Sequence, residues 1–538
     1  MENENTEIKE EKKNKKKRII IICVVVALVI INATVAYILI TNDNKEKINN
    51  KNKEVKSEYR ITSNDLTDFD LYFMKLENNG KNKIYSPLSI KYALEMLSEG
   101  AKGDTKSQID NIIGEYKANK YANSENMSFA NAMFIRNSFK DSIKKSYTDK
   151  LNKKYNAEII YDSFNKPDKV NNWVSDKTFK LINNLVDDIS SFDFILVNAL
   201  AIDMEWKKVI QARNFDDDTY SISYVHEKAK GDNWTYSHGI SPLNSEGYHP
   251  VKFNNGEKDY TSVQIGASAN KYDIIKELGE DKIRSTVKTE LEKWLDSKEG
   301  KDFCKDEFSK ASDECSGVDK YVEKYIKDIS SNYKKFKTST DFSFYDDEKV
   351  KAFAKDLKEY NGTTLEYVGI MPKEDTLVNF VKNNNSHNIN KIINSLKESK
   401  YDNFEDGVVT KVTGFIPVFK YDYELKLQED LEKLGVKNIF DSKKADLSNI
   451  VEGAYIGEVK HKANIEFTNE GIKAAAVTMA GGLGAAGGGF DYLFEIPTKE
   501  INLTFDKPYM YIIRDKKTGE VWFAGTVYEP TEFEQPVW

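Results

Sequence analysis

Residues that could carry out catalysis are few in this chain of 538 residues, and their spacing completes no catalytic motif. Among only five histidines, His226 with Glu227 begins an HExxH zinc-protease pattern, but Lys230 stands where the second His must be. Residues 482–487 match GxGxxG, a dinucleotide-binding pattern that needs a following helix, whereas more Gly and an aromatic, strand-like stretch follow here. We therefore expect neither an enzyme nor a cofactor or metal site.

Cysteine chemistry is limited to one local pair. Cys304 and Cys315 lie close together in a polar stretch with helical character. A disulfide between them is expected if the compartment is oxidising, with two free thiols as the alternative. A zinc site would need further ligands, and none stands nearby at ligand spacing.

The most unusual segment is an uncharged tract, 474–489, which reads AAAVTMAGGLGAAGGG in a chain that is 31% charged. Strand-like stretches, 456–467 and 492–511, lie on either side of it. A small-residue loop between two strands is suited to moving, to being cut or to touching a partner.

The N-terminus carries the only dense basic cluster, Lys12 to Arg18, followed by the uncharged apolar stretch Ile19 to Ile40. This predicts a cytoplasmic tail (1–18), a transmembrane anchor (19–40) and a stalk (41–62), with the rest outside the cell membrane. The alternative is a cleaved signal peptide and a secreted protein. The net charge of −8 gives no support to nucleic-acid binding.

The elements that must position any site alternate between helices and strands. Ser86 and Pro87 open a helix as cap and first-turn residue. Residues 194–204 predict a central strand covered on both faces, in which Asn198 is interpreted as a polar bridge between strands rather than a catalytic group. Helical stretches are expected at 273–298, 318–336 and 429–434. Further strands are expected at 129–136, 365–371, 408–419, 463–467, 501–505 and 521–527.

Several motifs, in order, resemble the serpin family. The motifs are IYSPLSI (84–90), EGAKGDT (99–105), FANAMF (129–134), LVNA (196–199) with Trp206, ADLS (445–448), VKHKA (459–463), EGIKAAA (470–476), FDKPY (505–509) and FAGTV (523–527). The resemblance covers about 66–213 and 342–530. It implies an α+β fold of three β-sheets with about eight or nine helices and an exposed reactive-centre loop.

The resemblance also divides the chain. It implies a serpin domain in two parts, 63–210 and 341–530, with the reactive loop at 469–500. Residues 211–340 are extra, and we expect them to form a helical insertion. A short C-terminal tail, 531–538, follows.

By the same resemblance, one group of residues forms a hinge and another controls opening of the main sheet. The hinge residues are Glu470, Gly471, Ile472, Lys473, Ala474, Ala475 and Ala476. The sheet-opening residues are Ser86, Ser89, Asn198, His461 and Trp206. Counting from Gly471 places the bond offered to a protease at Ala485–Ala486, whereas counting back from Phe505 places it near Ile496.

The resemblance implies an inhibitor of extracellular serine-type or cysteine-type endopeptidases, whose cleaved loop inserts into the sheet with the protease attached. Alternate residues from Ile472 are small as far as Gly484, as insertion into a closed sheet requires. About fifteen residues at roughly 3.3 Å each would carry the protease about 50 Å. An Ala bait suits elastase-like or subtilisin-like enzymes, bound covalently by a monomeric inhibitor. The alternative is a non-inhibitory surface binding or adhesion protein on the same scaffold.

Overall fold

The computed structural model describes residues 57–207, 248–267, 278–307, 309–332, 339–400, 404–405, 408–425, 427–457, 459, 461–469, 471–472, 490 and 498–534. The elements below belong to the unit that begins at Tyr59. The predicted tail and anchor, the stalk up to residue 56, the whole uncharged tract and the end of the C-terminal tail lie outside the described residues. Within the described residues no helix is both long enough and apolar enough to cross a membrane.

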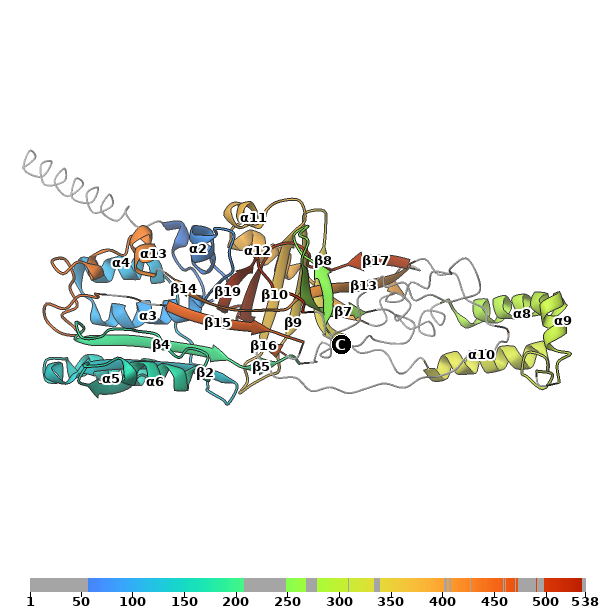
Figure 1. Cartoon of the computed structure of the whole chain (residues 1–538), viewed down its shortest axis with the longest axis horizontal. Coiled ribbons are helices and arrows are strands. Elements are labelled where there is room, and N and C mark those ends of the chain that lie inside the picture. The colour runs from blue at the N-terminus through green and yellow to red at the C-terminus, as the bar shows by residue number, and fades with distance from the viewer. Residues whose placement is uncertain are drawn as a thin grey trace, which may run out of the picture. The chain divides into compact units, whose positions relative to one another are not determined.

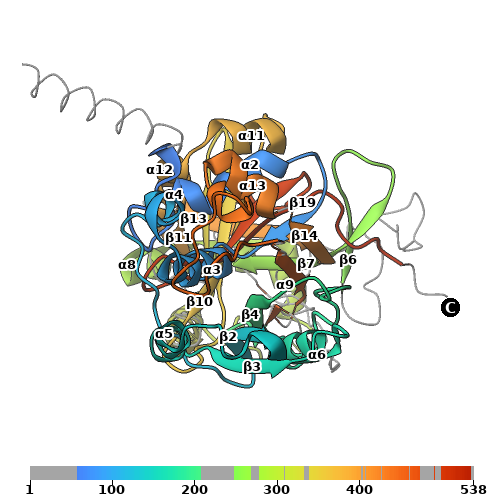
Figure 2. The same ribbon diagram turned by 90° about the vertical axis from the view of Figure 1, so that its left-hand side faces the viewer.

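The described residues contain eleven α-helices. They are α2 (Asp68–Glu77), α3 (Pro87–Gly100), α4 (Gly103–Ile113), α5 (Lys145–Tyr155), α6 (Asp168–Lys177), α8 (Glu280–Asp296), α9 (Lys298–Phe303), α10 (Val318–Asn332), α11 (Leu377–Asn383), α12 (Ser386–Asn394) and α13 (Leu427–Leu434). Figure 2 shows α2, α11, α12 and α13 gathered on one side, with α5 and α6 on the opposite side.

Strands form four hydrogen-bonded groups. The first is β1 (Lys83–Tyr85), β19 (Val521–Val527), β18 (Tyr509–Asp515), β10 (Leu365–Pro372), β9 (Val350–Asp356), β8 (Ser339–Asp346) and β11 (Lys397–Lys400). The second is β12 (Phe404–Glu405), β13 (Val408–Pro417), β7 (Asp259–Ala267) and β6 (His249–Lys252), with β17 (Thr498–Asn502) on β13. The third is β14 (Phe419–Leu425), β15 (His461–Phe467), β16 (Gly471–Ile472) and β5 (Met204–Glu205), and the fourth is β3 (Glu158–Asp162), β2 (Met127–Arg136) and β4 (Phe194–Ile202).

The third and fourth groups are two halves of one split sheet. A single residue, Asp203, separates β4 from β5, so the chain passes directly from one group to the other. β4 pairs along its length with β2, and β15 pairs along its length with β14. Among the described residues, β4 and β15 do not pair with each other, and only β16 connects β15 to β5. Figure 1 shows β4 and β15 as long strands with β16 and β5 near their ends.

Helix α3 begins where the sequence predicts. The Ser86 hydroxyl accepts a hydrogen bond from the Ser89 backbone N–H (3.1 Å), and Pro87 occupies the first turn. At the other end, a Cβ on Gly100 would lie 2.4 Å from the Ile450 side chain, so only glycine fits this close approach. α3 is therefore fixed at both ends beneath the sheets.

The range 211–340 is not wholly helical, which corrects the sequence-based expectation. β6 and β7 fall within it, and β7 pairs antiparallel with β13 in the second sheet. Val263 and Ile265 are buried there, which explains why this segment forms a strand despite its polar surroundings. The helical part begins at α8, and α8 packs on α10 through a small apolar core that contains Ile283, Val287 and Val322.

The pair α8 and α10, with α9 between them, is called the helical hairpin below. It contains the disulfide predicted from the sequence, between Cys304 and Cys315, whose Cα atoms are 5.6 Å apart. The disulfide closes the connection between α9 and α10.

Candidate functional site: a split sheet with a seated hinge

The hinge begins as a short strand already placed within the split sheet. β16 pairs antiparallel with β15, where Phe467 faces Ile472, and antiparallel with β5, where Gly471 faces Glu205. A tight turn at Thr468 reverses the chain between β15 and β16, and the Thr468 N–H donates to the Gly471 carbonyl (3.0 Å). Gly471 and Ile472 therefore start an additional strand between the two halves of the sheet.

The two hinge residues fit their places closely. A Cβ on Gly471 would lie 2.2 Å from the Met204 carbonyl oxygen, so a larger residue cannot occupy this position without moving β5. The Ile472 side chain is 2% exposed and lies in a small apolar space with Ile202 and Ile465. Since side chains alternate along a strand, an extension of β16 would place Ala474 and Ala476 on this inner face.

An aromatic cluster supports the turn before the hinge. The Trp206 indole N–H donates to the Thr468 carbonyl (3.0 Å), and its ring packs edge-on against Phe467 and Tyr367. The Tyr248 hydroxyl donates to the Asn469 side chain (2.8 Å). These contacts hold the turn in one position.

Below β16 a seam separates β4 from β15, and a cavity of about 370 Å³ lies along it. The lining comes from both edge strands and from the start of α3 beneath them, and includes Ser86, Ser89, Asn198, His461 and Lys462. The two halves of the sheet are thus separated over the length where a further strand would lie.

His461 connects β15 to the start of α3. The Ser86 backbone N–H donates to His461 Nε2 (2.9 Å), which requires that nitrogen to be unprotonated. Burial lowers the pKa of His461 from its usual 6.5 to about 4, so the ring is neutral at neutral pH. His461 is therefore a structural acceptor at the seam rather than a general base.

Asn198 is only partly satisfied. Its Nδ2 donates to Asn131 Oδ1 (2.7 Å), and Asn131 Nδ2 in turn donates to the Tyr155 carbonyl (2.9 Å). The Asn198 Oδ1 atom is buried and has no hydrogen-bond partner among the described residues. Asn198 is partly exposed because it lines the seam cavity, while most of β4 is buried.

Comparison with known proteins identifies this arrangement. The sequence profile of the serpin (serine protease inhibitor) family matches residues 63–230 and 327–530. The chain belongs to the serpin family. The match leaves out residues 231–326, which include most of the helical hairpin.

Individual serpins are distant in sequence. An uncharacterized serpin-like protein of Methanosarcina acetivorans is 23% identical over 511 residues, with 89% of this chain and 88% of that protein covered. Mouse neuroserpin is 22% identical, with 84% and 86% covered. Mouse leukocyte elastase inhibitor A is 31% identical over 193 residues, which are 35% of this chain and 46% of that protein.

Solved structures show the same serpin fold. The thermophilic serpin tengpin in its native state has a TM-score of 0.54 at 20% identity, covering 86% of this chain and 92% of that one. Thyroxine-binding globulin in complex with thyroxine has a TM-score of 0.51 at 16% identity, covering 86% and 97%. The α+β serpin fold predicted from the motifs is confirmed. Serpins are generally protease inhibitors rather than enzymes.

The structure brings most of the described candidate residues of this serpin together. Four of them, Ser86, Ser89, Asn198 and His461, line the seam cavity. Trp206, Gly471 and Ile472 lie where β16 joins β15 to β5. The remaining hinge residues (Glu470, Lys473, Ala474, Ala475 and Ala476) and the expected bait bond at Ala485–Ala486 lie outside the described residues.

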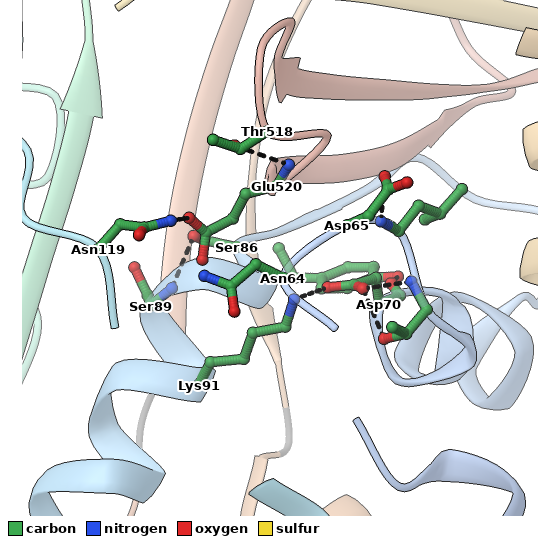
Figure 3. Close-up of polar contacts among 12 residues, drawn as sticks. Asn64, Asp65, Asp70, Ser86, Ser89, Lys91, Asn119, Thr518 and Glu520 are labelled. Atoms are coloured by element: carbon green, nitrogen blue, oxygen red, sulfur yellow. Dashed lines mark hydrogen bonds and ion pairs between the residues drawn. The ribbon is translucent and has the colours of Figure 1, made fainter. Parts of the chain in front are cut away.

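Sequence reasoning missed a buried ion pair on the other side of α3 (Figure 3). Lys91 Nζ lies 2.5 Å from Asp70 Oδ1, and both side chains are fully buried. Asp70 Oδ2 also accepts hydrogen bonds from the backbone N–H and the hydroxyl of Thr67. The available signal was a lysine within the apolar face of α3 and an acid at the third position of α2. This pair fastens α3, which forms the floor of the seam, to α2.

Proposed function

We propose that this serpin inhibits extracellular serine-type endopeptidases by inserting its cleaved reactive loop as a full strand between β4 and β15. The observation that carries the proposal is β16, a strand start hydrogen-bonded to both β15 and β5 above an unfilled seam. Cysteine-type endopeptidases are a secondary target class. No cofactor is required, because the target protease supplies the nucleophile.

The seam favours insertion for two physical reasons. An added strand antiparallel to both neighbours would pair with backbone groups on the free edges of β4 and β15. It would also bring a backbone donor close to Asn198 Oδ1, whose unpaired burial costs about 1–3 kcal/mol. The inward position of Ile472 sets the alternation, so small residues at 474, 476, 478 and 480 would face the core.

The proposed bait is the Ala485–Ala486 bond, which suits elastase-like or subtilisin-like proteases. The protease serine Oγ attacks the Ala485 carbonyl carbon, the amide bond breaks, and the Ala486 amine leaves with a proton. Ala485 then remains esterified to the protease while the upstream segment enters the sheet. The partial match to leukocyte elastase inhibitor A supports this target class.

The proposed location is the outer surface of the cell membrane, with residues 19–40 as the anchor and 1–18 in the cytoplasm. The length and apolar composition of this segment, together with its basic flank, support this location. A secreted form released by signal cleavage is the alternative.

The test is incubation with pancreatic-type elastase and with subtilisin, followed by denaturing electrophoresis and mass mapping of the cut. A complex that survives boiling in detergent, with a cut at or near Ala485–Ala486, is expected.

A matched pair of variants tests the insertion step separately from cleavage. Ala476→Arg would place a charge on the inner face and should give cleaved protein without complex. Ala475→Arg would place it on the outer face and should still form complex. Cleavage without complex in the unmodified protein, across several proteases, would refute inhibition.

A non-inhibitory surface-binding protein is the second candidate. The helical hairpin favours it, because residues 231–326 lie outside the family match yet contain an ordered, disulfide-linked element. If this candidate is correct, cleavage in the loop should leave the melting temperature unchanged.

A further inference from the structure

One residue of the reactive loop, Phe490, contacts the helical hairpin. Its ring centroid lies 5.6 Å from that of Trp294 on α8 and 5.8 Å from that of Tyr321 on α10, in an edge-on arrangement with the latter. The Tyr321 hydroxyl donates to the Phe490 carbonyl oxygen (3.1 Å). Both helices therefore grip the same residue, through its side chain and its backbone.

The hairpin has its own means of keeping these contacts in place. Lys288 on α8 pairs with Asp319 on α10 (2.8 Å), and Arg284 pairs with Glu323. The ring of Phe303 packs edge-on against Trp294. Together with the disulfide and the apolar core, these contacts hold α8 and α10 together independently of the loop.

We propose that the helical hairpin is an intramolecular docking site for the downstream side of the reactive loop, with Phe490 as the anchor. The effect of this docking on the choice of protease rests on the proposed function, whereas the contact itself does not. The docking gives a role to the additional residues within 231–326, which lie outside the family match. Phe490 divides the connection from β16 to β17 into an upstream arm, 473–489, and a downstream arm, 491–497.

Docking of Phe490 keeps the proposed bait bond near the helical hairpin. Ala485 is five residues from Phe490, so the two lie within about 18 Å of each other whatever path the chain takes. A protease bound at that bond must approach the hairpin closely. After the cut, the new end at Ala486 stays beside the hairpin, while the upstream arm is free to enter the seam. The hairpin would thus contribute to the choice of protease.

Hydrogen exchange read by mass spectrometry tests the docking in the intact, uncleaved protein. Phe490→Ala removes both ring contacts and should raise exchange about three- to tenfold in 285–296 and 318–326 and in the loop peptides, since aromatic pairs contribute about 0.5–1.5 kcal/mol. Tyr321→Phe keeps the ring and removes one hydrogen bond, so a smaller increase is expected. Tyr161→Ala removes a partly exposed ring from β3 and is the matched control, with no change expected in the hairpin.

Unchanged exchange in the hairpin and the loop for Phe490→Ala, in a variant that melts like the unmodified protein, would overturn the proposal. The two proposals fail separately. If no covalent complex forms with any protease but Phe490→Ala still loosens the hairpin, docking stands and inhibition fails. If complex forms, the association rate with elastase should change at least threefold for Phe490→Ala and not for Tyr161→Ala.

Discussion

The seven-stranded sheet and the split sheet use their strands differently. In the first, β10 pairs with β18 from Leu365 to Ile370 and with β9 from Glu366 to Pro372, so this strand has hydrogen-bonded neighbours on both sides. In the split sheet, β4 and β15 are each hydrogen-bonded to a neighbouring strand along one edge, while the other edge borders a cavity.

Their side chains differ in the same way. The rings of Tyr367 and Tyr511 stack in the seven-stranded sheet, with centroids 5.4 Å apart, and Phe419 of β14 stacks on Tyr511. The seam cavity instead combines apolar side chains with polar ones, including Ser86, Asn198 and His461, which line open space rather than a packed ring cluster. The comparison indicates that one region stabilises the fold, while the other retains the capacity to accept a strand.

The largest expected effect is the response of the seam to loop cleavage. If the upstream arm inserts, roughly ten or more new backbone hydrogen bonds at about 1 kcal/mol each should stabilise the cleaved form by on the order of 10 kcal/mol. Differential scanning calorimetry before and after cleavage should show a rise in melting temperature of well over ten degrees. Ala476→Arg should remove the rise and Ala475→Arg should keep it. An unchanged melting temperature would mean that the seam does not accept the strand.

The next largest effect concerns the buried pair beneath the seam. Lys91→Met leaves Asp70 buried without its cation and should lower the free energy of unfolding by about 3–5 kcal/mol in a urea titration. Adding Asp70→Leu should recover part of the loss, because a buried charge without a partner is worse than none. Lys145→Met breaks the exposed pair with Asp149 and is the control, with little change expected. If Lys91→Met and Lys145→Met lowered the free energy of unfolding equally, the ion-pair interpretation would be contradicted.

Local patterns made much of the fold and the seam predictable. The Ser86 cap, the strand at 521–527 and the helical stretch from Val318 follow from residue types and periodicity within a few residues of their observed bounds. The residues lining the seam were found through motifs, because each motif keeps a residue type at a fixed place on one strand or helix.

What could not be predicted depends on partners far apart in the sequence. β7 lies in a polar region and is a strand because it pairs with β13, about 150 residues away. Lys91 is buried because Asp70 comes from another helix and pairs with it, whereas the charge of a lysine alone favours solvent. The seating of Gly471 and Ile472 between β15 and β5 likewise depends on tertiary contacts, as does the docking of Phe490.

A smaller expected effect is the dependence of stability on pH, to which one histidine at the seam and one in the second sheet contribute. Burial lowers the pKa of both His461 and His249 from 6.5 to about 4. Between about pH 4 and pH 6.5 the unfolded chain binds more protons than the folded protein does. The stabilisation that each neutral, buried histidine gives is therefore complete above about pH 6.5 and is lost as the pH falls towards 4. Each site contributes at most about 3 kcal/mol.

Substituting the two histidines separately distinguishes the two regions. Either His461→Gln or His249→Gln should reduce the loss of stability on acidification. We also expect acid to promote entry of the uncleaved loop into the seam, because protonation of His461 breaks its bond from the Ser86 N–H. Only His461→Gln should change the rate of this entry. The rate is measured by the appearance of a form that is resistant to urea and no longer inhibits. Identical rates in both variants would show that His461 does not control the seam.

The smallest effect tests whether the seam is completed by the inserted strand. Asn198→Ala removes the donor to Asn131 but also the buried, unpaired Oδ1, so it should change the stability of the uncleaved protein by less than about 1 kcal/mol. In the cleaved form the same substitution also removes Asn198 Oδ1 as an acceptor for the inserted strand, so its cost should rise to about 2–3 kcal/mol. Urea titration of both forms measures the difference. An equal cost in both would mean that the unpaired oxygen of Asn198 finds no partner in the inserted strand, and the seam would then accept a strand through backbone pairing alone.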